Sequence, residues 1–351
     1  MRRFIPPLII LPLLAVAVVR LWPHRDARSE AHRQWPVMGT FLTVTGYGPD
    51  SGAARSAVGA AGRAVFRVDS LMSTWQPESE ISHLNDAAGS GQWTQLSPET
   101  LEVLLASRLL ARVSSGAFDV TVGPLMHVWG FRGAGVRVPP RAALDSAREL
   151  VGGSVLEVDS ARARARLQRR GSAVDLGAIA KGYALDLAAS AMRAAGASAG
   201  MVDLGGNVLV FGRPPAGRRE WVIGILDPRD PDSIIGEIRL AEGSVATSGD
   251  YEQFFEAGGI RYSHIMDPGR GEPARGTLQT TVVAPTGLQS DGLSTTLFVL
   301  GPDRGRAFLT QPFARGATAV WVRDSLPLDP ADVVVAGEAG ERIRIALPAP
   351  R

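Results

Sequence analysis

Cysteine is missing from this chain of 351 residues. Its absence excludes disulfides, a thiol nucleophile, cysteine-ligated zinc or iron–sulfur centres, and lipid attachment to an N-terminal cysteine. No GxxxxGK[ST] or HExxH motif is present, so neither a P-loop nucleotidase nor a zinc protease of that type is indicated. The formal net charge is only +2, and no compact basic run is interleaved with aromatic residues, so we expect no nucleic-acid partner.

Lysine is almost absent as well, because Lys181 is the single lysine among 37 lysine and arginine residues. A bias in base composition can replace exposed lysines by arginine, but not a lysine whose compact, flexible ammonium is needed. Lys181 lies where "DLGAIAKG" opens an expected helix, a place that suits an anionic ligand. We interpret it as a functional residue, and the alternative is a lysine that survived by chance.

The N-terminal segment 1–23, "MRRFIPPLIILPLLAVAVVRLWP", has two arginines followed by an apolar run. This pattern predicts a signal peptide or an N-terminal membrane anchor. The apolar run is marginal for a bilayer span, which needs about 20 residues, so cleavage and retention both stay open. We expect the body to be exported to the periplasmic side of the inner membrane, after a polar linker over 24–34.

The remainder, 35–348, is expected to be a single two-lobed α+β domain with mixed sheets. Helices and strands alternate without a regular βαβ repeat, which disfavours a doubly wound parallel sheet. The patterns predict helices over 53–71, 98–113 and 180–195, an extended piece over 118–125, a hairpin over 200–212, and strands over 221–226, 235–240, 278–284, 316–322 and 341–347.

Aspartates follow several apolar runs, and Asp-Gly turns would explain any one of them. As a group, they suggest carboxylates collected at strand ends: Asp119, Asp175, Asp203, Asp267 and Asp291. In "SDGLSTTLFVLG", Asp291 and Thr295 are four residues apart and would share one helix face. Helix capping is the simple explanation, whereas oxygen ligands for Mg²⁺ are the functional one.

A series of motifs resembles the ApbE family, the FAD:protein FMN transferases, which are usually exported and often membrane-anchored. The matching pieces are "MGT" (38–40), "MSTWQPESEISHLN" (72–85), "SGAFDVTVGPL" (115–125), "VDLGAIAKGYALD" (174–186), "VDLGGNV" (202–208), "ATSGDYEQFFEAGGIRYSHIMDP" (246–268) and "VAPTGLQSDGLSTTLFVLG" (283–301). Each piece is weak alone, but their order is specific.

The resemblance implies a Mg²⁺-dependent enzyme that transfers FMN from FAD to a threonine hydroxyl of a target flavoprotein, releasing AMP. Threonine-bearing targets would include subunits of membrane redox complexes. Two alternatives stay open: an FAD pyrophosphatase that yields free FMN and AMP, and a non-catalytic periplasmic FAD-binding protein.

The resemblance also implies roles for individual residues. FAD would contact Met38, Trp75, Ala117, Phe118, Asp119, Asp175, Lys181, His264 and Ile265. Mg²⁺ would be held by the carbonyl of Ala178 and by Asp291, Ser294 and Thr295. Asp291 and His264 would be catalytic. From the residues themselves we interpret His264 as the base for the threonine proton, which Asp267 could orient or charge, and the alternative is a histidine that only hydrogen-bonds the flavin edge. Two departures are Trp75, where the family often has tyrosine, and Arg270, where threonine is common.

Overall fold

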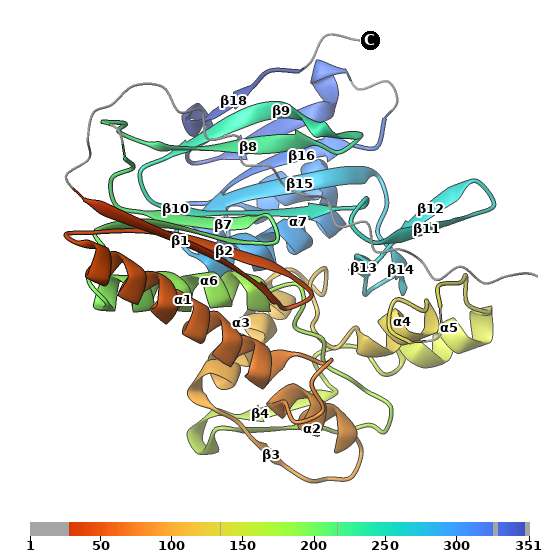
Figure 1. Ribbon diagram of the computed structural model, residues 1–351. Coiled ribbons are helices and arrows are strands. Elements are labelled where there is room, and N and C mark those ends of the chain that lie inside the picture. The colour runs from red at the N-terminus through yellow and green to blue at the C-terminus, as the bar shows by residue number, and fades with distance from the viewer. Residues whose placement is uncertain (1–27, 134, 216, 326–328, 348–351) are drawn as a thin grey trace, which may run out of the picture.

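The computed structural model describes residues 28–133, 135–215, 217–325 and 329–347. Its centre is an eight-stranded antiparallel sheet in the order β1-β2-β6-β7-β10-β15-β16-β17 (Figure 1). The strands are β1 (Ser29–Val37), β2 (Thr40–Gly48), β6 (Ala199–Leu204), β7 (Asn207–Phe211), β10 (Gly243–Gly249), β15 (Thr277–Ala284), β16 (Thr318–Arg323) and β17 (Val333–Gly337).

Helices α1 (Ser51–Met72), α6 (Ala180–Ala194) and α7 (Gly287–Phe308) cover one face of this sheet (Figure 1). In α1 the buried residues recur every three or four positions, as an amphipathic helix requires: Ala54, Ala57, Val58, Ala61, Gly62, Val65, Val68 and Met72. Asp50 caps the N-terminus of the helix, because its carboxylate accepts a hydrogen bond from the Ala53 amide at 2.9 Å. The main hydrophobic core lies between these helices and the sheet.

A second, three-stranded sheet covers the other face of the central sheet (Figure 1). Its order is β18-β9-β8, with β8 (Trp221–Asp227), β9 (Asp230–Leu240) and β18 (Ile343–Ile345). Trp221, Ile225 and Ile238 of this sheet pack against Val210 and Val320 of the central one. The central strands β7 and β15 are therefore buried along their whole length, on both faces of the sheet.

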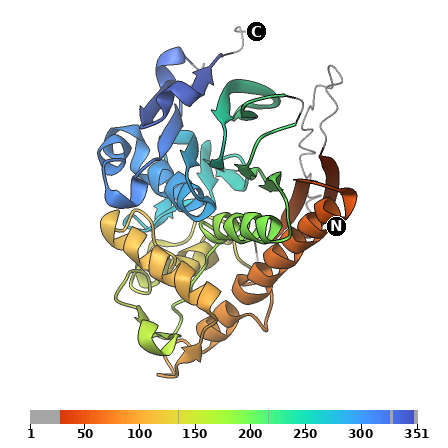
Figure 2. The same ribbon diagram turned by 90° about the vertical axis from the view of Figure 1, so that its left-hand side faces the viewer.

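The remaining elements form smaller parts beside and below the main body (Figures 1 and 2). They comprise α2 (Glu80–Asp86), α3 (Pro98–Val113), α4 (Gly123–Val128), α5 (Arg141–Arg148), β3 (Thr94–Gln95), β4 (Leu156–Asp159), β5 (Arg164–Leu167), β11 (Phe254–Ala257), β12 (Ile260–Ser263), β13 (Met266–Asp267) and β14 (Glu272–Pro273). Four short 3₁₀ turns are η1 (Ser160–Arg162), η2 (Pro312–Ala314), η3 (Pro330–Asp332) and η4 (Gly340–Arg342).

The mixed α/β architecture and the three helices expected over 53–71, 98–113 and 180–195 are confirmed by α1, α3 and α6. The extended piece expected over 118–125 is wrong, because Val120 and Thr121 form a turn, Val122 makes only an isolated bridge to Ala173, and α4 begins at Gly123. Pro124 stands in the first turn of α4, where its fixed φ favours a helix and its missing N–H costs nothing. The β-branched residues before it concealed this start.

The expected linker over 24–34 is also wrong in its second half, since β1 begins at Ser29 and pairs with β2 along its whole length. The strand lies at the edge of the sheet, so most of its side chains face solvent and its composition resembles that of a linker. The expected signal or anchor segment, 1–23, lies outside the described residues. Among those residues, no helix is both long and apolar enough to cross a membrane.

Candidate functional site

One large cleft, of about 2730 Å³, opens beside the central sheet. Its walls include the β1–β2 and β6–β7 turns, the loop before α6, the first half of α7, and the segment 247–266. It contains all but one of the residues expected to bind FAD or metal: Met38, Trp75, Ala117, Phe118, Asp119, Asp175, Ala178, Lys181, His264, Ile265, Asp291 and Thr295. The exception is Ser294.

Two tight hairpin turns form one rim of the cleft. The β1–β2 turn places Met38 and Gly39 at φ 52° and 71°, and the β6–β7 turn places Gly205 and Gly206 at φ 62° and 88°. Two consecutive residues at positive φ define the turn type that matches the twist of paired strands. Met38 adopts a positive φ, which is strained for a residue with a side chain but not for glycine. In this conformation Met38 lines the cleft.

Asp291 is held at the crossing of α6 and α7. Its residue is 4% exposed, its Oδ2 accepts a 2.8 Å hydrogen bond from the Gly182 amide, and its Oδ1 accepts a 2.9 Å bond from Asn207 Nδ2. Burial raises the pKa of Asp291, whereas the Lys181 charge and the two hydrogen bonds oppose that rise. The carboxylate is thus fixed in orientation while it lines the cleft.

The same crossing depends on two glycines and one cap. A Cβ on Gly182 would lie 2.0 Å from the carbonyl oxygen of Gly287, so the two backbones touch directly. The carboxylate of Asp186 accepts hydrogen bonds from the Gly287 and Leu288 amides at 2.6 and 2.8 Å. It thereby satisfies free N–H groups at the start of α7 and ties α7 to α6.

The side-chain ammonium of Lys181, in α6, makes no hydrogen bond or ion pair with another residue in the described part of the chain. It lines the cleft, and its charge favours the ionised forms of Asp203 and Asp291, both of whose pKa values are raised by burial. The ammonium lies near two buried carboxylates but forms an ion pair with neither of them. It therefore remains available to an anionic ligand.

The oxygen atoms around Asp291 suit a hard cation. Asp291, Thr295 and Ala178 line the cleft, and the described residues contain no group of three or more His, Cys, Asp or Glu side chains that could hold a metal. A single carboxylate with a hydroxyl and a carbonyl is a partial ligand set that Mg²⁺ completes with water and substrate phosphates. The residues present therefore fit Mg²⁺, although they would not form a closed site.

Ser294 does not belong to that set. It is 1% exposed, and its hydroxyl donates a 2.8 Å hydrogen bond to the carbonyl of Asp291, one turn earlier in α7. The hydroxyl also lies 2.9 Å from Oγ of Ser248, which in turn lies 3.2 Å from Oγ1 of Thr295. Ser248, which the sequence did not single out, therefore fixes the hydroxyl that does face the cleft.

His264 follows β12 and lies half-buried in the cleft wall. Its amide donates a 2.9 Å hydrogen bond to the carbonyl of Gln253, and its Nδ1 lies 3.3 Å from the same oxygen. When Nδ1 carries the proton for this contact, Nε2 is the free acceptor. Burial lowers the pKa of His264; the Glu252 charge opposes this, and the Lys181 and Arg132 charges add to it. Burial and the two nearby cations therefore favour the neutral imidazole.

Asp267 does not orient this imidazole, contrary to the expectation from sequence. It lies outside the cleft, and its Oδ1 accepts a hydrogen bond from the amide of Arg270. The carbonyl of Gln253 takes the orienting position instead, and Glu252 supplies the nearby negative charge. A backbone carbonyl carries no signature in the amino-acid pattern, so the sequence could not reveal it.

Asp119 and Asp175 are both tied down by local hydrogen bonds. Oδ1 of Asp119 accepts from the amide and the hydroxyl of Thr121, and burial raises the pKa of Asp119. Oδ1 of Asp175 accepts from the amide of Gly177 at 2.9 Å, which shapes the loop that leads to Lys181. Trp75 differs from both, since it is 71% exposed, so ordinary core packing does not explain it.

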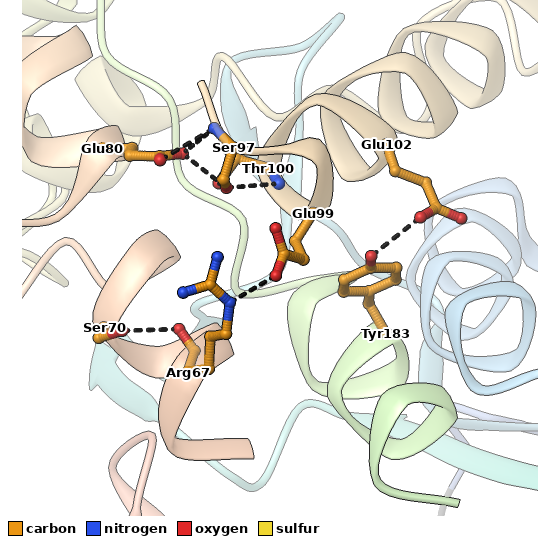
Figure 3. A network of polar contacts seen from close by, with 8 residues as sticks. All are labelled: Arg67, Ser70, Glu80, Ser97, Glu99, Thr100, Glu102 and Tyr183. Atoms are coloured by element: carbon orange, nitrogen blue, oxygen red, sulfur yellow. Dashed lines mark hydrogen bonds and ion pairs between the residues drawn. The ribbon is translucent and has the colours of Figure 1, made fainter. Parts of the chain in front are cut away.

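A polar network joins α2, α3 and α6, and α6 carries Lys181 (Figure 3). Glu80 on α2 accepts hydrogen bonds from the amide and hydroxyl of Ser97, the residue that caps α3. The hydroxyl of Tyr183 on α6 donates to Glu102 on α3 at 2.9 Å (Figure 3). Burial and Glu102 raise the pKa of Tyr183, so this phenol stays a donor and fixes α6 two residues after Lys181.

A mixed α/β fold with a large cleft and a lysine that makes no ion pair in the described part of the chain suits the binding of an anionic small molecule. The chain belongs to the ApbE family, whose family model matches residues 38–321. Solved structures agree. A Thermotoga maritima ApbE protein is 32% identical with a TM-score of 0.77, covering 89% of this chain and 98% of that one. The flavin transferase ApbE from Vibrio cholerae is 29% identical with a TM-score of 0.76, covering 88% and 97%.

Curated relatives point the same way. A protein from Klebsiella pneumoniae named FAD:protein FMN transferase is 33% identical over 275 residues, covering 77% of this chain and 78% of the relative. One of the same name from Rhodobacter capsulatus is 35% identical over 272 residues, covering 76% of this chain. The match spans about half of that relative, at 51% of its length.

Proposed function

We propose that this protein transfers FMN from FAD to a threonine hydroxyl of a target flavoprotein, with Mg²⁺ bound and AMP released. The observation that carries the proposal is the convergence in one cleft of His264, Lys181 and the Asp291–Thr295 pair. Family membership supplies the reaction class, since the relatives are named FAD:protein FMN transferases.

In this mechanism the residues position and neutralise charge, which is what phosphoryl transfer needs. The threonine oxygen forms a bond to the phosphorus of the FMN half, the bridging P–O bond breaks, and AMP leaves with the electron pair. Nε2 of His264 accepts the threonine proton, because Nδ1 faces the Gln253 carbonyl. Lys181 binds phosphate oxygens, because its ammonium forms no ion pair with another residue in the described part of the chain.

Asp291, Thr295 and the Ala178 carbonyl would hold Mg²⁺, which would supply positive charge to the phosphate oxygens. The chain's own contribution is to hold these oxygens in place. Gly182 and Asn207 fix the Asp291 carboxylate, and Ser248 contacts the Thr295 hydroxyl.

A second candidate is hydrolysis of FAD to FMN and AMP, in which water takes the place of threonine. Family membership favours transfer over hydrolysis and over a non-catalytic FAD-binding protein, because the curated relatives are named FAD:protein FMN transferases.

The decisive experiment incubates the protein with FAD, Mg²⁺ and a candidate threonine-bearing flavoprotein, such as a subunit of a membrane redox complex. Flavin fluorescence that stays on the target after denaturation, with one AMP per flavin attached, supports transfer. Free FMN and AMP without labelled target would indicate the pyrophosphatase, and bound but unconverted FAD would indicate the binding protein.

The proposal includes export to the periplasmic side of the inner membrane, which the charged and apolar pattern of residues 1–23 supports. Fractionation of cells that express the full chain, followed by N-terminal sequencing, distinguishes a cleaved signal from a retained anchor. Recovery of the uncleaved chain from the cytoplasm would contradict export.

A further inference from the structure

Arg132, which follows α4, joins two parts of the cleft wall that are distant in sequence. Its Nε and Nη2 atoms lie 2.9 and 2.8 Å from Oδ2 of Asp175. Its guanidinium carbon lies 5.2 Å from the centre of the Trp75 ring, within cation–π range. Arg132 thus donates two N–H groups to one carboxylate oxygen and places its planar guanidinium over an indole. Lysine has neither the forked donors nor the planar group.

Both partners of Arg132 matter to the site. The other oxygen of Asp175 accepts from the Gly177 amide, so the ion pair anchors the loop that presents Ala178 and Lys181. Trp75 is 71% exposed, and the guanidinium of Arg132 contacts one face of its ring, so this contact restrains the indole at the cleft.

Arg132 is also close to the residue proposed as the base. It lines the same cleft as His264, and its charge acts on that imidazole. The preceding residue, Phe131, meets the imidazole edge-on with ring centres 6.5 Å apart. Residues 131 and 132 therefore form a wall that links the stacking ring, the Asp175 loop and His264.

We propose that Arg132 is a positioning residue of the dinucleotide site, which holds the Trp75 ring and the Asp175 loop in register for a flavin nucleotide. This inference rests on the proposed function, because it takes FAD to be the ligand. It assigns Arg132 to substrate affinity, whereas the chemical step belongs to His264 and the metal-binding residues.

The test measures FAD binding without any acceptor protein, by quenching of flavin fluorescence in the full chain with Mg²⁺. Arg132→Gln is expected to weaken FAD affinity by roughly 10-fold or more, since it removes a charge-assisted fork and a cation–π contact. Arg132→Lys keeps the charge but loses the forked pair of N–H donors. Its FAD affinity is therefore expected to lie between that of the unmodified chain and that of Arg132→Gln.

Arg164 is a closely matched control outside the cleft. Its side chain is 30% exposed, against 29% for Arg132, and its Nε lies 3.0 Å from Asp159. It also lies 4.4 Å from the Trp93 ring centre, so it makes the same two kinds of contact. Arg164→Gln is expected to change FAD affinity by no more than about twofold relative to the unmodified chain. The substitution removes a surface ion pair, which contributes only to the stability of the fold.

A second readout separates positioning from general loosening of the fold. Because the Arg132 charge lowers the pKa of His264, Arg132→Gln should move the imidazole titration to higher pH, while Arg132→Lys should not. The titration can be followed by NMR in the absence of FAD. A structural defect without a change of charge would move both variants alike.

Unchanged FAD affinity in Arg132→Gln and Arg132→Lys would overturn the inference, as would an equal loss in Arg164→Gln. If Arg132→Gln does not fold, Arg132→Lys decides the question, and wild-type affinity in that variant counts against the inference. Failure of the unmodified chain to bind FAD would contradict the proposed function itself, and the inference with it. Binding that is insensitive to Arg132 contradicts the inference alone.

Discussion

The amide of Gly182 on α6 donates a 2.8 Å hydrogen bond to Oδ2 of Asp291 on α7. The contact forms because neither helix carries a side chain where the two cross, at Gly182 and Gly287. Backbone geometry thus sets the place of the carboxylate, and the first prediction tests this dependence.

Gly182→Ala should destabilise the fold by about 3 kcal/mol, the upper end of overpacking costs, because its Cβ would meet the Gly287 carbonyl at 2.0 Å and the Asp291 Cβ at 2.5 Å. Chemical denaturation measures the loss. Gly59→Ala, within α1, is the control and should be neutral or stabilising, since only the end of the Arg63 side chain is near. Equal stability of the two variants would show that the crossing adapts.

Asp291→Ala, or removal of divalent metal, should slow AMP release by roughly 1,000-fold or more, because charge on the phosphate oxygens is then not neutralised. Ser294→Ala should retain the metal dependence, because the Ser294 hydroxyl is bonded to the Asp291 carbonyl and does not line the cleft. AMP release is measured by chromatography. Full turnover in metal-free enzyme would eliminate the proposed metal site.

Lys181→Met should weaken FAD binding or slow turnover, since it removes the cation that faces the two carboxylates of Asp203 and Asp291. Lys181→Arg should restore only part of the loss, because a planar fork does not reproduce a compact ammonium. Titration with FAD measures the affinity. If both variants match the parent protein, the single lysine has no role in the site.

His264→Ala should keep FAD and Mg²⁺ binding but slow FMN transfer by ~100- to 10,000-fold, as expected for loss of a general base. In the parent protein, transfer should fall as pH drops through the lowered pKa of His264, because only the neutral imidazole accepts a proton. His127→Ala, outside the cleft, is the control. Near-normal transfer by His264→Ala would rule out this base, and weakened FAD binding with a proportionate loss of rate would make it a binding residue.

Asp250→Asn should stabilise the protein near pH 8 but not near pH 4. Burial raises the pKa of Asp250 from 3.8 to about 6, although Arg261 opposes this, and its Oδ1 has no hydrogen-bond partner in the described part of the chain. The native state holds this proton more tightly than the unfolded state, so stability falls as pH rises from about 4 to 6. The loss reaches about 3 kcal/mol. Thermal unfolding at the two pH values tests this, with the exposed Asp303→Asn as control.

The elements with a strong local pattern were predictable from the sequence. The cap at Ser97 and the helix after it follow from side chains that act within a few residues of one another. Edge strand β1 and helix α4 were not, because the pairing of β1 with β2 and the helical start at Pro124 outweigh a misleading local composition. Local propensity is a weak prior where tertiary contacts decide.

The candidate site, like the fold, was predictable only in part. The sequence motifs identified the side chains that line the cleft, but not the groups that orient these side chains. Asn207 and Gly182 hold Asp291, and the Gln253 carbonyl holds His264, through contacts between residues up to 109 positions apart. Ser294 was misplaced for a related reason, since spacing along a helix does not show that a hydroxyl will bond to its own backbone.

The lone lysine has a practical consequence for chemistry on this protein. Amine-directed reagents, such as an activated ester or formaldehyde with a reductant, can modify only Lys181 and the terminal amine, because all other cationic side chains are arginine or histidine. Lys181 lines the cleft, so a single covalent tag there would report on whether the cleft is filled. Protection from labelling by a bound dinucleotide could then be read by mass spectrometry in the unmutated chain.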